Sequence, residues 1–398
     1  MNTKNTSYKK SILGELFLTN SSSCAELSER MGKSLSLATK MVNELVEEDL
    51  VIEKGLAPSS GGRRPLTYSL RPDSFYIVAV AMDQFVSRIA ILDAHKNFVT
   101  PTKEIELALA KNDQALEKLT EHILSVIETT KIDRDKVIGI GIGMPGFIDP
   151  HKGANYTFLG ADICNYIQSK TNLPVFIEND SSAIALAEYK FGAARGESNA
   201  MVVNIGWGVG LGMIIDNKLF RGEDGFAGEF SHIPLFQNGK LCSCGKIGCL
   251  ETESSLNYML DRAATEIENG KASFLKSAVL SSDKHETKFQ QFIQAAIIGD
   301  SVTVGIISDV GYNIGRGIAI LIHLLNPSKI VLSGRGSAAG KIWLAPIQHA
   351  IPRLVSNTKI VVSTLNHDAE IIGAASLVIE NIKDCPMEKI FLKHSLAK

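Results

Sequence analysis

The alternation of strand-like and helix-like segments constrains this chain most strongly, because it begins at Phe75 and continues over more than 300 residues. The helix-like stretches span 113–130, 181–191 and 309–325. The strand-like runs are YIVAVAM (76–82), RIAILDA (88–94), VIGIGIGM (137–144), LPVFIEN (173–179), AMVVNIGWGVGLGMIID (200–216) and KIVLSG (329–334). Strands that alternate with helices over such a length are typical of α/β proteins. The sequence therefore predicts an α/β fold for the chain after residue 71.

Two glycine-rich segments, 141–146 and 205–212, lie at the ends of strand-like runs. Ligands of open α/β sheets bind beside the ends of strands, where glycine lets the backbone come close to them. We therefore expect two α/β lobes with a ligand cleft between them.

The bulk composition excludes several protein classes. The 398 residues carry a formal charge of −2, so any contact with nucleic acid must be local rather than spread over the surface. The longest apolar run, GIAILIHLL at 317–325, is much shorter than the ~18 residues of a membrane span. Six cysteines scattered over a chain of this length do not make a disulfide framework. We expect a cytoplasmic protein that does not associate with a membrane.

The first 71 residues follow a different pattern, that of three short helices. Apolar residues keep helical spacing around 12–17, and a second helix spans about 25–31 and ends at Gly32. A third helix spans about 35–48 and is entered through Ser34. A short helix, a tight turn and a further helix are typical of a helix-turn-helix.

Two short strand-like runs, 50–53 and 66–70, then flank a tip rich in glycine, serine and proline, as in a wing. Residues 1–71 carry ten Lys and Arg against eight Asp and Glu, whereas the rest of the chain is acidic. We therefore predict a winged helix-turn-helix that binds DNA. The expected contacts are Ser34, Ser36, Thr39, Lys40, Asn43, Arg63 and Arg64.

These contacts have different expected roles. Asn43 suits bidentate recognition of adenine in the major groove, whereas Lys40 and Ser36 suit phosphates. Arg63 and Arg64 lie on the tip of the wing and suit a minor groove. The alternative for each of these residues is an ordinary solvated surface.

Three of the six cysteines fall within eight residues of the segment AGEFSHIPLFQNGKLCSCGKIGCLE (227–251). One imidazole and three thiolates make a complete tetrahedral set for structural Zn²⁺. The predicted ligands are His232, Cys242, Cys244 and Cys249. A closed shell of this kind leaves no position for an activated water, so the metal would be structural. The alternative is a set of buried free thiols beside a core histidine.

In the segment IENDSSAIALAE (177–188), Asn179 and Asp180 stand where a strand ends and a helix begins. A carboxylate at this place can accept a hydrogen bond from a substrate hydroxyl or act as a general base. Considered alone, an Asn-Asp pair before two serines is more often a helix cap than a functional site.

Five segments, taken in order, resemble the ROK family, which groups bacterial sugar kinases with sugar-responsive repressors. They are GIGMPGFID (141–149), IENDSSAIALAE (177–188), GWGVGLG (206–212), AGEFSH (227–232) and CSCGKIGCLE (242–251). The resemblance runs from about residue 75 to about 378 and includes the specific cysteine signature with its trailing glutamate. It implies a two-lobed actin-like (ribonuclease H-like) ATPase-type fold behind the winged helix-turn-helix.

The resemblance also implies a sugar site. In kinases of the family the Asp that matches Asp180 is the catalytic base, and the histidine that matches His232 both contacts sugar and binds zinc. Ser231 stands where the family usually has glycine. The implied sugar contacts are Gly146, Asn179, Asp180, Glu229, His232 and Glu251.

The phosphate loops of the kinases are altered here. The family's D-x-G-G-T loop corresponds to residues 81–85, where Ala81 replaces Asp, Phe85 replaces Thr and both glycines are lost. In the second loop, G-T-G-x-G, Trp207 replaces Thr. Glycine admits phosphate closely, whereas Thr and Asp help to hold phosphate and magnesium. The sequence therefore predicts a protein that is not an enzyme, with Asp180 as a vestigial base.

We predict a transcriptional regulator, most simply a repressor that releases operator DNA when a sugar or sugar phosphate binds the interlobe cleft. It should act as a homodimer or a dimer of dimers. The expected domains are 1–71, the DNA-binding domain, 72–185, the first lobe completed by 374–398, and 186–373, the second lobe with the zinc site and the dimerisation surface. Two alternatives stay open: a sugar kinase with an accessory DNA-binding domain, and an adaptor that binds a protein instead of sugar.

Overall fold

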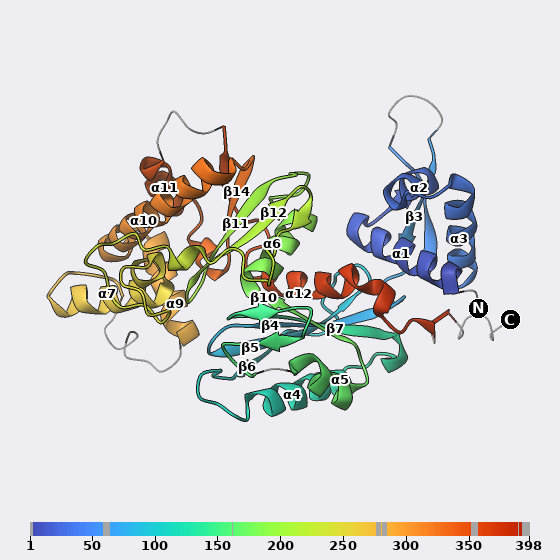
Figure 1. Ribbon diagram of the computed structural model, residues 1–398, viewed down its shortest axis with the longest axis horizontal. Helices are drawn as coiled ribbons and strands as arrows, with labels where there is room; N and C mark the ends of the chain where they lie inside the picture. The colour runs from blue at the N-terminus through green and yellow to red at the C-terminus, as the bar shows by residue number, and fades with distance from the viewer. Residues whose placement is uncertain are drawn as a thin grey trace. The chain divides into compact units, whose positions relative to one another are not determined.

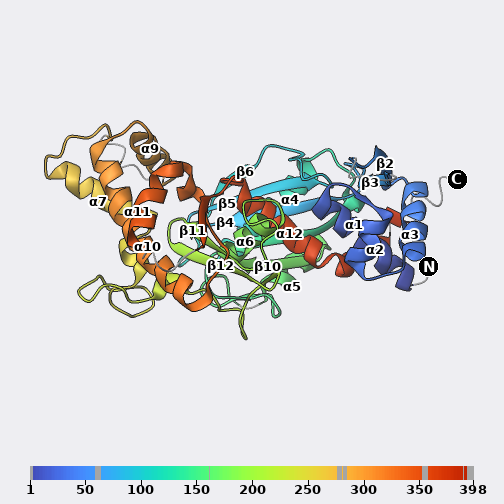
Figure 2. The same cartoon turned by 90° about the horizontal axis from the view of Figure 1, so that it is seen from above.

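The structure is a computed structural model, and it describes residues 3–58, 64–160, 162–275, 280, 285–351, 357–388 and 390–391. The chain forms two compact units. The first unit comprises Met1–Met82, Val86–Glu178 and Ala374–Lys398, and the second comprises Asp83–Phe85 and Asn179–Gly373. Figures 1 and 2 show the elements of both. The domain boundaries expected at residues 71 and 185 stay proposals.

The N-terminal residues form the expected helix-turn-helix and wing. Helices α1 (Thr3–Thr19), α2 (Cys24–Met31) and α3 (Leu35–Glu47) pack beside a three-stranded sheet in the order β1-β3-β2, made of β1 (Ser22–Ser23), β2 (Val51–Leu56) and β3 (Leu66–Leu70). Ser23 and Glu26 form a capping box at the start of α2, and Gly32 ends that helix with a φ of 59°. The Ser34 side chain caps α3 by accepting a hydrogen bond from the Leu37 amide.

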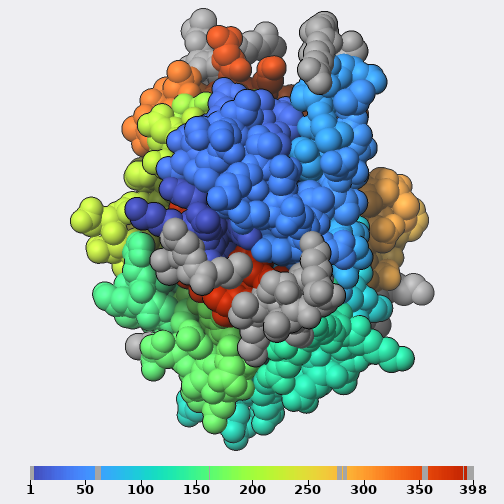
Figure 3. Space-filling model, turned by 90° about the vertical axis from the view of Figure 1, so that its right-hand side faces the viewer, coloured from blue at the N-terminus to red at the C-terminus, as the bar shows by residue number. Residues whose placement is uncertain are grey.

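The N-terminal helix-turn-helix and wing, which we call the head, are attached to the rest of the first unit through α1. The Lys10 ammonium is buried and donates to the carbonyl oxygens of Lys383 (3.2 Å) and Cys385 (2.6 Å). Lys96, in the turn after β5, donates to the carbonyl oxygen of Phe17 over 2.7 Å. The red C-terminal residues accordingly lie directly beside the blue helices in Figure 3. Cationic donors on backbone carbonyls are charge-assisted hydrogen bonds, so the head is firmly joined to this unit.

The larger sheet of the first unit has the order β10-β7-β4-β5-β6. Its strands are β4 (Tyr76–Met82), β5 (Val86–Asp93), β6 (Lys103–Glu106), β7 (Val137–Met144) and β10 (Val175–Asn179). Helices α4 (Ala115–Thr129) and α5 (Ile163–Thr171) cover one face, and α12 (Asp368–Glu380) covers the other from Ala374 onward (Figure 1). A Cβ on Gly141 of β7 would lie 1.8 Å from the Ala374 carbonyl oxygen, so α12 packs directly on the strand backbone.

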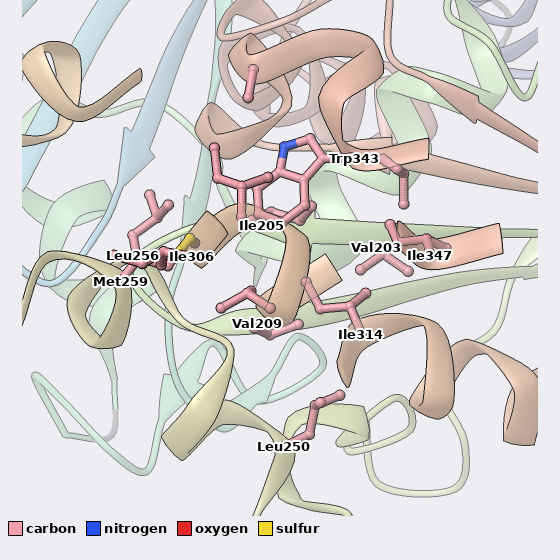
Figure 4. Packing of buried hydrophobic residues seen from close by; sticks show 14 of the residues in the cluster. Val203, Ile205, Val209, Leu250, Leu256, Met259, Ile306, Ile314, Trp343 and Ile347 are labelled. Atoms are coloured by element: carbon pink, nitrogen blue, oxygen red, sulfur yellow. The ribbon is translucent and has the colours of Figure 1, made fainter. Parts of the chain in front are cut away.

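The second unit has a sheet in the order β13-β12-β11-β14-β15. Its strands are β11 (Ala200–Ile205), β12 (Val209–Ile215), β13 (Lys218–Leu219), β14 (Lys329–Ser333) and β15 (Lys359–Val362). Helix α6 (Asp180–Lys190) covers one face, and the other face packs on α7 (Leu256–Glu268), α9 (His285–Ile297), α10 (Ser301–Leu325) and α11 (Leu344–Ala350). Figure 4 shows Val203, Ile205, Ile314 and Trp343 in this core.

The two larger sheets share one topology. In the first unit β4 pairs antiparallel with β5 and parallel with β7, and in the second β11 pairs antiparallel with β12 and parallel with β14. The last strand of each sheet leads into a helix, α6 after β10 and α12 after β15, that reaches the sheet of the other unit. Two copies of one sheet plan agree with the two lobes expected from the sequence.

Several elements differ from the sequence-based expectation. The run 200–216 is two antiparallel strands joined by a turn at 206–208, because its glycines allow a reversal within an apolar stretch. Helix α10 begins at Ser301 rather than at residue 309, and Asp300 caps it by accepting from the Thr303 amide. Strands β6 and β15 were not predicted, because each is four residues long and carries lysine.

The remaining short elements connect these layers. They are β8 (Ile148–Asp149), β9 (Ala154–Asn155) and the 3₁₀ turns η1 (Arg134–Lys136), η2 (Phe230–His232), η3 (Leu250–Glu253), η4 (Arg335–Trp343) and η5 (Ile382–Asp384). Within the described part of the chain, α10 is the one helix long and apolar enough to cross a membrane. Of its most apolar window, 56% is buried in the protein, as in the core helix of a globular unit, so α10 is weak evidence for a span.

Replacing Gly141 by alanine should destabilise the protein, because the added methyl group would overlap the backbone of α12. Overpacking of this kind costs about 1–3 kcal/mol or more, and thermal unfolding followed by circular dichroism measures it. Gly305→Ala is the matched control, because this glycine is exposed near the start of α10 with no heavy atom near the new methyl group. The control should be neutral or stabilising, and equal melting temperatures for the two variants would contradict the packing.

Candidate functional site

The four predicted metal ligands come together in the second unit. Their ligand atoms all lie within 4.8 Å of one another. The Cys242 Sγ is 3.4 Å from His232 Nδ1, and the Cys244 and Cys249 sulfurs are 3.6 Å apart. Gly248 lets the loop fold back, since its φ is 76° and a Cβ there would lie 1.7 Å from the Phe236 carbonyl oxygen. One imidazole and three sulfurs at these separations can hold a metal ion.

The chemistry of the thiols also fits a cation. Burial raises the pKa of Cys249 to about 12, and the neighbouring Cys244 and Cys242 add to this rise. Three thiolates in such close contact repel one another, and a divalent cation removes that repulsion because it binds the deprotonated sulfurs. The donor set therefore fits a structural Zn²⁺.

Asn179 and Asp180 stand at the start of α6, where the sequence placed them. The Asn179 Oδ1 accepts hydrogen bonds from the amides of Ser181 (3.0 Å) and Ser182 (3.3 Å), so this side chain is the helix cap. The Asp180 Oδ1 accepts from the Ser181 amide over 2.8 Å. The interpretation of Asn179 as a helix cap is thus confirmed, whereas the binding of a substrate hydroxyl by Asp180 stays a prediction.

The environment of Asp180 changes its ionisation. Burial raises the pKa of Asp180 to about 6, with a further rise from the charges of Glu370 and Asp83, while hydrogen bonds from Ser181 oppose it. The Asn204 side chain on β11 donates to Asp180 Oδ2 over 3.4 Å and to the Ser181 hydroxyl over 3.1 Å. Sequence reasoning missed Asn204. The feature that could have identified it is a single amide side chain within an apolar strand.

Glu229 lies close enough to Glu251 and Asp180 for their charges to interact. Burial raises the pKa of Glu229, and the charges of Glu251 and Asp180 raise it further. The Glu229 Oε2 lies 3.7 Å from His232 Nε2, so the histidine directs one nitrogen to the cysteines and the other to Glu229. We call Asp180, Glu229 and Glu251 the carboxylate group. Several acceptors held near one another can bind the hydroxyls of a sugar ring.

The turn between β11 and β12 borders this group. A Cβ on Gly208 would lie 2.6 Å from Glu251 Oε2, so the carboxylate lies close to the backbone of this turn. The Trp207 carbonyl oxygen accepts a hydrogen bond from Asn257 (3.4 Å), and Gly206 accepts from the Leu256 amide (3.1 Å). The glycines of this loop thus have packing roles that the sequence pattern could not separate from phosphate binding.

Gly146 belongs to the first unit, whereas the other predicted sugar contacts belong to the second. Its φ is 103°, and a Cβ there would lie 2.8 Å from Thr157 Cβ. The Asn155 side chain fixes the turn by donating to the Pro145 carbonyl oxygen over 2.9 Å. Ser231 is buried within η2, directly before the ligand histidine.

The predicted DNA contacts divide into three kinds. Ser36, Lys40 and Asn43 are exposed on α3, whereas Thr39 is half-buried, which corrects its expected exposure, because it faces Cys24 of α2. Ser34 is exposed, but its hydroxyl is used as the helix cap. Arg64 is exposed beside the wing tip, and Arg63 lies outside the described residues.

The two altered phosphate loops contact each other. The Trp207 indole nitrogen donates to Asp83 Oδ2 over 3.1 Å, and the Arg335 guanidinium donates to the same oxygen over 2.7 Å. Phe85 packs edge-on against Trp207 with ring centroids 5.6 Å apart. The sequence indicated that both loops had changed, but not that the replacements bind each other.

The comparisons with known proteins agree with this architecture. The ROK family description matches residues 88–381. The xylose repressor of Bacillus spizizenii is 30% identical over 393 residues, which cover 94% of this chain and 96% of the repressor. A crystal structure of a ROK family transcriptional regulator, a homolog of the E. coli MLC protein, has 25% identity and a TM-score of 0.75, and it covers 98% of this chain and 100% of its own.

A kinase structure matches less of the chain. The ROK family glucokinase from Streptomyces griseus, solved in complex with glucose and AMPPNP, has 26% identity and a TM-score of 0.65. The match covers 98% of the glucokinase but 76% of this chain. The predicted fold class, a winged helix-turn-helix followed by a two-lobed α/β fold of the ROK type, is confirmed. The ROK family description and the xylose repressor each match most of this chain, and the chain therefore belongs to the ROK family.

Proposed function

We propose that this protein is a sugar-responsive transcriptional repressor. The observation that carries the proposal is the coverage of the relatives: the xylose repressor and the MLC-like regulator match 94% and 98% of the chain, including the head, whereas the glucokinase matches 76%. The chain thus matches the regulators over almost its whole length, as expected for a protein with a DNA-binding domain before the ROK fold.

The head supplies the DNA contacts of this proposal. Ser36, Lys40 and Asn43 lie exposed on α3, the second helix of the helix-turn-helix, which enters the major groove in such domains. Arg64 at the wing suits the adjacent minor groove, and the proposal includes Arg63 on sequence grounds. One recognition helix buries too little surface for operator specificity, so the protein acts as a dimer on two half-sites of double-stranded DNA.

The carboxylate group supplies the sensor. Ionised Asp180, Glu229 and Glu251 accept hydrogen bonds from the hydroxyls of a sugar or sugar derivative, and His232 adds a ring nitrogen beside Glu229. Asn179 caps α6 through its side-chain oxygen, and the proposal includes it among the sugar contacts by analogy with the family. Gly146 contributes a backbone contact by analogy with the family.

Phosphoryl transfer is not part of the proposed function. Trp207 and Asp83 occupy positions where the family's kinases have the threonine and glycine of their phosphate loops, and the two side chains are hydrogen-bonded to each other. A carboxylate beside a phosphate site would repel the nucleotide. The protein therefore binds sugar without turnover, and its place of action is the cytoplasm, where operator DNA is found.

Structural Zn²⁺ completes the site. His232, Cys242, Cys244 and Cys249 would hold the ion, and it would tie η2 to the loop that ends in Glu251. The metal supplies no chemistry to a substrate, because all four positions are taken by protein ligands. Its role is to fix two sugar contacts, His232 and Glu251, relative to Glu229.

Operator release by sugar tests the function directly. Duplexes selected by the protein from a random library should bind with nanomolar affinity, and one of D-xylose, D-glucose, N-acetyl-D-glucosamine or their phosphates should weaken that binding at least about tenfold. Fluorescence anisotropy of labelled duplex measures the release. Asn43→Ala should weaken binding to the selected duplex by about 1–3 kcal/mol if Asn43 reads a base.

Calorimetry with the same sugars separates the repressor from the alternatives. A kinase requires Mg-ATP to bind, and we expect no heat from Mg-ATP in the presence or absence of sugar. If none of the sugars altered operator binding, the sensor role would be wrong. If Glu229→Ala left regulation intact, the carboxylate group would not be the sensor, and an adaptor for a protein would fit better.

Cys249→Ser should reduce bound zinc from about one ion per chain, because a Cys₃His site loses a ligand and its affinity. Sugar affinity should fall at least about tenfold, or 1.4 kcal/mol, while operator binding without sugar persists, since the head lies in the other unit. Elemental analysis and calorimetry measure the two effects. Cys164→Ser, at a cysteine distant from the ligand cluster in sequence and unit, is the control. Unchanged sugar sensing in protein verified as metal-free would contradict the proposed role of zinc in fixing the sugar contacts.

Sugar affinity should fall with decreasing pH, because Asp180 accepts sugar hydroxyls only when ionised. The pKa of Asp180 is raised to about 6, so the carboxylate is ionised at pH 7.5 and mostly neutral at pH 5.5. We expect an affinity about fourfold weaker at pH 5.5 than at pH 7.5, measured by calorimetry with zinc content checked at both values. Asp180→Asn should bind weakly and without this dependence. An equal pH dependence in Asp180→Asn would assign the titration to another group.

A further inference from the structure

The strongest feature that the proposed function leaves unused is a cluster around Asp83 in the second unit. Its charged members are held by hydrogen bonds and its aromatic members by ring contacts. We call it the Asp83 cluster, and it consists of Asp83, Phe85, Trp207, His285, Glu286 and Arg335.

The cluster is built around a buried cation. Arg335 is 6% exposed, donates to Asp83 Oδ2 over 2.7 Å and is also hydrogen-bonded to Glu286. Its guanidinium carbon lies 5.4 Å from the centre of the Trp207 ring. A buried charge is tolerated only when it is paired and hydrogen-bonded, so loss of Asp83 leaves Arg335 poorly compensated. The arrangement is therefore specific rather than a chance surface contact.

Aromatic rings close the other side. Phe85 stacks on His285 with ring centroids 3.9 Å apart and planes within 8° of parallel. Trp207 contacts both rings edge-on, at 5.6 Å from Phe85 and 5.5 Å from His285. The Asp83 Oδ1 accepts a hydrogen bond from the Phe85 amide over 2.7 Å. This bond fixes the β4–β5 turn, from which Asp83 and Phe85 contact the rest of the cluster.

Two short routes connect this cluster to the carboxylate group. Trp207 is followed by Gly208, where an added Cβ would lie 2.6 Å from the Glu251 carboxylate. Arg335 is preceded by Gly334, where an added Cβ would lie 2.0 Å from Asn204 Oδ1, and Asn204 donates to Asp180. A shift of Glu251 or Asp180 on binding a ligand would therefore meet the backbone beside each of the two donors to Asp83.

The assignment of Asp83 to the second unit is a further observation. Residues Asp83–Phe85 are part of the second unit, although the strands on both sides of them, β4 and β5, are part of the first unit, which also contains the head. The turn thus carries the chain out of one unit and back again, and the Asp83 cluster is what holds it.

We propose that the Asp83 cluster is a latch that couples the sugar site to the unit bearing the DNA-binding head. Asp83, Trp207 and Arg335 hold the β4–β5 turn on the second unit, and sugar binding at Asp180 and Glu251 changes that hold through Asn204 and Gly208. The latch uses the chain's own side chains at both altered phosphate loops, so coupling needs no nucleotide. Asp83 is a positioning residue, and this inference rests on the proposed sensor function.

Asp83→Ala tests the latch, with Asp309→Ala as the matched control. Asp309 forms a 2.7 Å ion pair with Arg262 in the same unit but outside the cluster. Trp207→Phe removes one donor while it keeps an aromatic ring, so it covers the case in which Asp83→Ala does not fold, as judged by circular dichroism. Two measurements follow: operator affinity with and without the sugar that releases the wild-type protein, and hydrogen exchange of residues 83–87.

We expect Asp83→Ala and Trp207→Phe to bind sugar and operator separately but to lose most of the coupling, from at least about tenfold toward onefold. Exchange of residues 83–87 should accelerate by about tenfold or more in Asp83→Ala and stay unchanged in Asp309→Ala. Coupling in both latch variants equal to that of Asp309→Ala would overturn the latch.

The latch can fail independently of the sensor function. If no sugar releases the wild-type protein from DNA, the proposed function fails, and the exchange experiment alone decides whether the turn is held. Equal exchange of residues 83–87 in Asp83→Ala and Asp309→Ala would then overturn the latch as well. Faster exchange confined to Asp83→Ala would support the held turn.

Discussion

The close packing of α6 on β12 is the constraint on which the rest of the second unit depends. A Cβ on Gly210 would lie 1.9 Å from the Ser181 hydroxyl, and one on Gly212 would lie 2.3 Å from Ala185 Cβ. The helix can therefore approach the strand only because both positions are glycine. This contact sets where α6 begins, and with it the position of Asp180 relative to the β11–β12 turn and Glu251.

The same packing explains why Asp180 is both held and perturbed. The N-terminus of a helix favours an anion, and the Ser181 amide binds the carboxylate directly. Burial acts in the opposite direction and dominates, so the pKa rises to about 6. A group balanced in this way responds to a hydroxyl donor, because a new hydrogen bond stabilises the charged form. In a kinase that balance suits a base, and in the proposed regulator it suits a sensor.

Sequence reasoning predicted the features that depend on local pattern or on residue chemistry. The capped helices α2 and α3, the strands β4, β5, β7, β10 and β14, and the His-Cys₃ set are all read from periodicity, caps and spacing. It missed what depends on tertiary contact. Asn204 is an unremarkable residue until β11 places it beside Asp180, and Arg335 has no pattern that connects it with Asp83, 252 positions away. The half-burial of Thr39 likewise follows from α2, not from α3 alone.

Most glycines of the segment 206–212 are explained by packing within the protein. Gly210 and Gly212 are each required by a neighbour in α6, whether or not phosphate binds. The residue between Gly206 and Gly208 is under no such restriction, and here it is Trp207, which donates a hydrogen bond to Asp83. A glycine-rich motif therefore reports the packing of this lobe. Nucleotide binding is better judged from the residues between the glycines and at the β4–β5 turn. These residues distinguish loops that bind a nucleotide from loops that bind each other.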